Sequence, residues 1–301
     1  MACDAGAKPA PPPAPDKVPA KAQWVATAIA GPNLAYLPAD SDLFVHVDVA
    51  ALRASKLWST YEHDVAKLLV PGFECDDAPL HDAATVEIGV ALKTGLGVFV
   101  IRGLDRDKTL RCLHASAAAR FDGDVVTVTR GGETAILTFV DAATMVMQRG
   151  KQPTRATLTE VVRSPGAPLA QDPVFSTAMK HLPPKAGVMV LSRPNSEELR
   201  KKSGQLGVPY QYFHGSLDVT DQPATNVQLK FALVFATTDQ ATQLAAMMRG
   251  QTSSPQVKQM FDRFEVGAQG DTMTVDIGMS EPRLASLIGM FKSMLSMQSS
   301  N

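Results

Sequence analysis

Three segments of this chain recur in the same order, and this internal repeat limits the possible folds more than any other feature of the sequence. In each copy a Leu-Pro turn leads into a β-rich run, an apolar strand leads into a helix, and a Gly-Asp turn leads into an alternating strand. The matched pairs are residues 37–48 with 182–193, 98–105 with 231–239, and 123–129 with 270–276. Matches in a fixed order predict two copies of one supersecondary unit.

Each copy has the pattern strand, helix, strand, helix, strand, which predicts helices on one side of a mainly antiparallel sheet. The expected class is therefore α+β, with two tandem two-layer α/β sandwich repeats of the ferredoxin-like kind. The first copy carries two extra strands, at 134–140 and 144–148, followed by a helix near 154–163. Asp105 and Asp239 stand where a helix N-cap or a first-turn acid is expected.

The expected domain limits follow composition. Residues 1–23 are a disordered Pro/Ala-rich tether, 24–163 form the first repeat domain, and 164–301 form the second, after a Ser-Pro-Gly-Ala-Pro boundary. The second copy ends in a helical stripe at 282–297 that we interpret as core packing. Its apolar members are Leu284, Leu287, Ile288, Phe291, Met294 and Leu295.

The start of the chain, MACDAGAKPAPPPAPDKVPA, places Cys3 directly before the tether. This stretch resembles the mature end of a bacterial lipoprotein, in which a cysteine carries lipid and a flexible spacer follows. The resemblance implies lipid attachment at Cys3 and membrane anchoring. The alternative is a cytosolic protein whose third residue happens to be cysteine.

The other two of the three cysteines, Cys75 and Cys112, both lie in the first copy. In an oxidising compartment they are natural disulfide partners, whereas in the cytosol they would be inert thiols. The formal net charge of -1 argues against a general role on nucleic acid, because binding phosphates requires an excess of basic residues. The sequence contains no apolar run long enough to cross a bilayer.

Two clusters could carry chemistry. Residues 75–82 contain a thiol, an imidazole and three carboxylates that could hold a divalent metal, although the paired spacing of structural zinc sites is absent and an acidic loop is the alternative. Those side chains are Cys75, Asp76, Asp77, His81 and Asp82. His46 and Asp48 share one face of a strand and could act as base and orienter, or simply face solvent. Neither a nucleophile elbow nor a dinucleotide loop occurs, so we expect no cofactor.

The turn at 36–42, the alternating strand after it and the charged run at 102–108 together resemble uncharacterised secreted lipoproteins of myxobacteria and related bacteria. The resemblance implies a tethered envelope protein and brings no catalytic residues with it. We therefore expect a non-catalytic, lipid-anchored protein on the periplasmic or extracellular face, which binds a protein or peptide partner or serves as a scaffold. The alternative is a hydrolase that uses a metal in the 75–82 loop or the His46/Asp48 pair.

Overall fold

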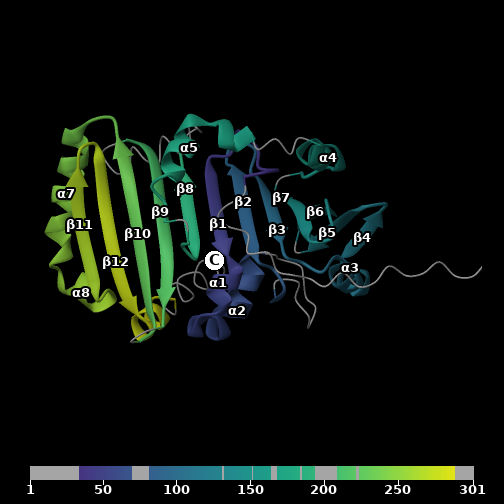
Figure 1. Ribbon diagram of the computed structural model, residues 1–301, viewed down its shortest axis with the longest axis horizontal. Helices are drawn as coiled ribbons and strands as arrows, with labels where there is room; N and C mark the ends of the chain where they lie inside the picture. Colours follow the sequence, from purple (N-terminus) through teal and green to yellow (C-terminus); the bar gives the residue numbers. More distant parts are fainter. Residues whose placement is uncertain are drawn as a thin grey trace, which may run out of the picture.

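One large antiparallel sheet organises the molecule (Figure 1). The computed structural model describes residues 34–69, 81–130, 132–150, 152–163, 168–183, 185–193, 209–221 and 224–288. The predicted tether at 1–23, with Cys3, lies outside the described residues.

The sheet contains twelve strands. They are β1 (Leu43–Asp48), β2 (Thr85–Ala91), β3 (Leu96–Arg102), β4 (Ala119–Asp122), β5 (Val125–Arg130), β6 (Glu133–Phe139), β7 (Thr144–Gly150), β8 (Val188–Ser192), β9 (Tyr210–Thr220), β10 (Asn226–Phe235), β11 (Arg263–Gln269) and β12 (Thr272–Ser280). Burial alternates along strands that have one covered face, such as β5, whereas β3 and β7 of the first half are buried on both faces. The helices are α1 (Val49–Arg53), α2 (Lys56–Leu69), α3 (Arg106–Ala115), α4 (Arg155–Arg163), α5 (Pro173–Met179), α7 (Thr238–Thr252), α8 (Pro255–Met260) and the 3-10 turn η2 (Pro168–Gln171).

The strand order is β11-β12-β10-β9-β8-β1-β2-β3-β7-β6-β5-β4, and each neighbouring pair is antiparallel. The predicted α+β class with a mainly antiparallel sheet is thus confirmed. The finer expectation is not met. A ferredoxin-like unit separates the two strands of its βαβ element with another strand, whereas β1 and β2 pair directly. The strands of the two expected sandwiches also form one continuous sheet.

The two halves of the sheet join through β1 and β8, the strands that the sequence matched with each other. Val45 pairs with Val190, and these residues occupy equivalent positions in the alignment of 37–48 with 182–193. On either side the order is alike, β1-β2-β3 in one direction and β8-β9-β10 in the other. The extra strands β6 and β7 lie between β3 and β5, whereas β10 pairs directly with β12.

Helices cover both faces of the sheet, so the expectation that they all lie on one side is wrong. On one face, Trp58 of α2 and Leu113 of α3 join a core with strand residues such as Ile101. On the same face, α7 packs on β10 and β12. On the opposite face, Leu158 of α4 and Phe175 of α5 pack in a second core with strand residues such as Val100. This second layer arises because the strands of the first half are apolar on both faces.

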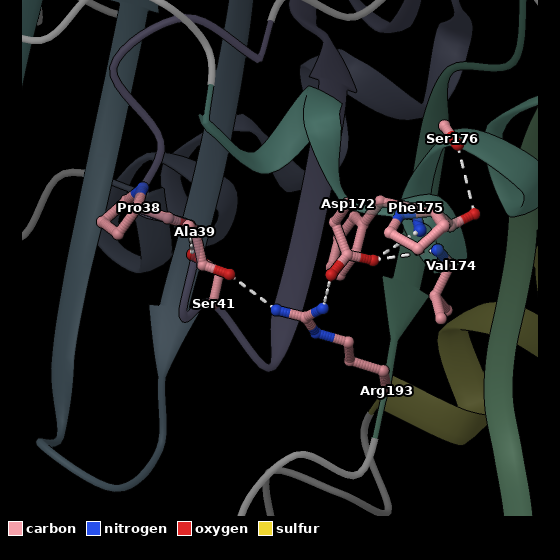
Figure 2. Close-up of polar contacts among 9 residues, drawn as sticks. Pro38, Ala39, Ser41, Asp172, Val174, Phe175, Ser176 and Arg193 are labelled. Atoms are coloured by element: carbon pink, nitrogen blue, oxygen red, sulfur yellow. Dashed lines mark hydrogen bonds and ion pairs between the residues drawn. The ribbon is translucent and has the colours of Figure 1, made fainter.

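Arg193, directly after β8, links the two halves on the face covered by α5 (Figure 2). Its guanidinium forms an ion pair with Asp172, the N-cap of α5, and donates to the Ala39 carbonyl at 2.6 Å. Its backbone N–H donates to the Asp42 carbonyl at 2.9 Å. The turn before β1 and the start of α5 are therefore held by one side chain.

Several local expectations hold. Asp105 is the N-cap of α3, and Asp239 lies in the first turn of α7 behind the N-cap Thr237. Residues 281–288 are helical, and Leu284 and Leu287 pack against the core of the second half. The remainder of the predicted stripe lies outside the described residues. Among the described residues, we find no helix with the length and apolarity needed to cross a bilayer.

Candidate functional site

A groove of about 500 Å³ lies on the face of β9–β12 opposite α7, and we refer to it as the β9–β12 groove. In Figure 1 these strands face the viewer with no labelled helix drawn across their centre. The segment after α5, which includes His181 and Leu182, forms one side of the groove. The sheet itself supplies the floor.

Two rows of side chains cross the floor, because antiparallel partners lie side by side on one face. The first row consists of one histidine and three residues with small side chains. These are His214, Ala232, Thr274 and Gly267. The second row is polar and consists of Ser216, Lys230, Asp276 and Glu265. Small side chains in one row leave the space that the groove occupies.

The polar row carries three charged side chains, of which Asp276 is paired within the described residues. Asp276 forms an ion pair with Arg263. Within the described chain, Lys230 and Glu265 are exposed and form neither an ion pair nor a side-chain hydrogen bond. The two charges have opposite signs and lie on either side of Asp276. A ligand with a carboxylate near one end and a cation near the other would complement them.

Three rings stack at the α5 side of the groove. The His214 ring centroid lies 5.7 Å from that of His181 and 6.1 Å from that of Tyr212. Burial lowers the pKa of His214, and repulsion from His181 lowers it further. The neutral imidazole of His214 therefore presents both a donor and an acceptor to the groove.

The predicted pair of His46 and Asp48 does not form. His46 is buried, and its Nδ1 lies 3.2 Å from Oε1 of Glu87, whose other oxygen is ion-paired with Arg102. Asp48 instead caps α1, where its Oδ1 accepts a hydrogen bond from the Ala51 N–H at 2.8 Å. The strand face of His46 is thus neither open to solvent nor arranged as an acid–base site, because Glu87 lies opposite His46 in the register.

The predicted metal loop is only partly described, since Cys75, Asp76 and Asp77 lie outside the described residues. The two candidate metal ligands within the described residues, His81 and Asp82, form ion pairs with residues outside the loop. His81 is ion-paired with Glu62 at 2.6 Å, and Asp82 with Lys108 at 3.0 Å. Within the described ranges, no group of three or more His, Cys, Asp or Glu side chains could hold a metal ion.

Cys112 lies on α3, is buried, and is disulfide-bonded. The cysteine that it bonds lies outside the described residues, so the expected pairing with Cys75 remains a prediction.

Sequence reasoning missed the residues that carry most of this chemistry. Glu87 stands between Val86 and Ile88 in an apolar strand, and a charge at such a position is almost never fully buried without a partner. Lys230 interrupts an apolar strand in the same way, between Leu229 and Phe231. An isolated charge inside a strand was the available signal in both cases.

Comparison with known proteins supports the fold alone. Neither a protein-family profile nor a curated protein matches the chain. Among solved structures, the chain is similar to crystal form I of TP0453, with a TM-score of 0.56 and 10% identity over 87% of this chain and 98% of that one. Crystal form III of TP0453 gives a TM-score of 0.55 and 10% identity, over 85% of this chain and 97% of that one. The chain therefore has the large-sheet α+β fold of TP0453.

Proposed function

We propose that this protein is a lipid-anchored envelope protein that binds a partner protein through the β9–β12 groove and has no catalytic role. The observation that carries the proposal is that Lys230 and Glu265 lie exposed in the groove and, among the described residues, form no ion pair or side-chain hydrogen bond. Two charges without partners in the described part of the chain, beside a floor of small side chains, suit an extended peptide segment of a partner protein. Its acidic group would lie at Lys230 and its basic group at Glu265.

The proposed localisation, anchored to a membrane in an oxidising compartment, is supported by two independent features. Cys3 precedes a Pro/Ala-rich spacer, the order of a lipid anchor and its tether. The disulfide at Cys112 suits an oxidising compartment, because thiols in the cytosol are kept reduced. Mass spectrometry of the N-terminus of protein from its own host tests the anchor. A lipid mass on Cys3 is expected, and an unmodified Met1 would rule the anchor out.

We also propose that the sheet is two copies of one unit placed around the β1–β8 pair. The order β1-β2-β3 on one side and β8-β9-β10 on the other supports this arrangement, as does the pairing of Val45 with Val190. The two copies differ on the face of the groove, since α4 and α5 cover the first half there. Duplication followed by loss of the cover on the second copy would leave a binding face on that same copy.

Thr274→Trp tests the groove, because Thr274 is an exposed residue in the row of small side chains and tryptophan would fill it. Thr129→Trp is the matched control, since Thr129 is an exposed strand threonine on β5. Wild type and both variants would be cross-linked in envelope preparations and the captured proteins quantified. A partner that is held by wild type and by Thr129→Trp but lost with Thr274→Trp is expected. Identical capture by all three proteins would exclude the groove.

The rival hypothesis, a hydrolase, receives less support. His46 pairs with Glu87 inside the sheet, away from Asp48. The metal version of this hypothesis is tested by metal analysis of protein purified without chelator. Stoichiometric zinc that is lost in His81→Ala would favour the hydrolase over a binding protein.

A further inference from the structure

A second cavity, of about 470 Å³, lies on the first half of the molecule, between the turn before β1, the β2–β3 hairpin and α4. Its apolar lining includes Leu37, Leu96 and Val161. Its polar lining includes Gln148 in the second half of β7, Asp40 in the turn, and Glu160 on α4. The cavity is separate from the β9–β12 groove, with which it shares no lining residue.

Gln148 is the first sign that this cavity takes a ligand. The residue is 1% exposed, and its Oε1 accepts a hydrogen bond from the Thr157 hydroxyl at 2.8 Å. Its Nε2 has no hydrogen-bond partner in the described part of the chain. A buried amide donor without a partner is unfavourable, so a ligand that accepts a hydrogen bond from Nε2 would recover that loss on binding.

Tyr36 is the second sign. It lines the cavity and has a φ of +67°, in the left-handed region that a bulky residue rarely adopts. Strained backbone of this kind persists where the surrounding structure holds it, and it is concentrated at ligand sites. The turn that contains Tyr36 is held by Arg193, which donates to the Ala39 carbonyl (Figure 2).

The charges of the cavity select the class of ligand. Asp40 and Glu160 are exposed, and within the described residues neither forms a hydrogen bond or ion pair, although the Asp40 charge interacts with the nearby Arg193 guanidinium. Two carboxylates repel an anion, so the acceptor that meets Gln148 is a neutral carbonyl or hydroxyl. The same carboxylates accept hydrogen bonds from hydroxyl groups, and the apolar walls suit the C–H faces of a ring.

We propose that this cavity binds a neutral saccharide unit, with a carbonyl or hydroxyl oxygen accepting from Gln148 Nε2 and ring hydroxyls donating to Asp40 and Glu160. The site is a ligand site in its own right and does not depend on the anchor or on the β9–β12 groove. We expect a single sugar unit to bind with a Kd on the order of 1 mM, because it makes only a few polar contacts.

Saturation-transfer NMR and titration calorimetry on the full chain test the proposal with three probes: N-acetylglucosamine, glucose and glucuronate. Binding of at least one neutral sugar is expected, together with weak or absent binding of the anionic glucuronate. Glu160→Gln should weaken binding of the neutral sugar several-fold. Gln148→Leu should weaken binding by about tenfold, the effect expected from the loss of one hydrogen bond. Lys230→Gln, in the other groove, should leave the affinity unchanged.

Three results would overturn the proposal. The first is no binding of either neutral sugar at 10-fold above the expected Kd of about 1 mM. The second is tighter binding of glucuronate than of glucose. The third is equal affinity in wild type and Glu160→Gln, a variant at an exposed helix position that folding tolerates. Since Glu160→Gln is informative even if Gln148→Leu fails to fold, the test does not depend on the buried position.

Discussion

Glu87 and Arg102 form an ion pair inside the sheet, where their side chains are 0% and 7% exposed. The second oxygen of Glu87 contacts the buried His46 imidazole at 3.2 Å. One carboxylate thus compensates the buried guanidinium and also gives His46 its partner. Because buried charges are costly without partners, removing Glu87 alone takes this counter-charge from Arg102 and this contact from His46.

Glu87→Leu should therefore destabilise the protein by about 3–5 kcal/mol, since it leaves Arg102 buried without a counter-charge. The double variant Glu87→Leu/Arg102→Met should regain most of that loss, because apolar side chains of similar size can replace a buried pair at little cost. Urea unfolding followed by circular dichroism would measure both. A loss below about 1 kcal/mol in the single variant would show that Arg102 finds water or another partner.

Asp172 has two roles that substitution can separate. Its Oδ1 accepts from the backbone N–H groups of Val174 and Phe175 at 2.9 and 3.1 Å, and its Oδ2 is ion-paired with Arg193 (Figure 2). Asp172→Asn should cost about 1 kcal/mol, because asparagine caps a helix as well as aspartate does and only the charge is lost.

Asp172→Ala should cost about 2 kcal/mol, because it removes the cap as well as the ion pair. Thermal unfolding of the two variants beside wild type gives the comparison. If the asparagine and alanine variants unfold at the same temperature, the cap contributes nothing and the ion pair accounts for the whole effect.

The sequence predicted the positions of most strands because their signals are local. Alternating apolar residues and Gly-Asp turns mark β5 and β12, and an acid before a helix marks the start of α3. The joining of β1 to β8 was not predictable in the same way. Strand edges pair through backbone groups that every residue carries, so the choice of neighbour depends on the whole sheet.

The candidate sites were less predictable still, since each depends on residues that are distant in sequence. The β9–β12 groove combines Lys230 with Glu265 through their common neighbour Asp276. His46 was predicted to act with Asp48 or to face solvent, and both predictions were wrong because its partner Glu87 comes from another strand. The sequence shows which residues have reactive or charged side chains, but the pairing register of the strands determines which of them come into contact.

Gly103 should be far less tolerant of substitution than Gly132, although both have φ in the left-handed region, at +86° and +81°. A Cβ on Gly103 would lie 2.6 Å from the Ala84 backbone nitrogen, whereas a Cβ on Gly132 would meet nothing within 4 Å. Gly132→Ala should cost about 1–2 kcal/mol from backbone strain alone. Gly103→Ala adds a clash with backbone and should cost about 2–5 kcal/mol. Equal losses in urea unfolding would contradict the close approach of Gly103 to Ala84.

The stability of the protein should depend on pH through His214. Its pKa is lowered in the folded state by burial and by His181, whereas in the unfolded chain it returns to about 6.5. The unfolded state then binds more protons below that pH, so the stability present above about pH 6.5 is lost as the pH falls through the folded pKa.

Urea midpoints measured at pH 8 and pH 5 should show this loss in wild type and a smaller loss in His214→Phe, which keeps an aromatic ring in the stack but cannot be protonated. Tyr212→Phe is the matched control. It preserves the neighbouring ring, and burial raises the pKa of Tyr212 further above this range, so its loss should equal that of wild type. An unchanged loss in His214→Phe would mean that other groups govern the acid response.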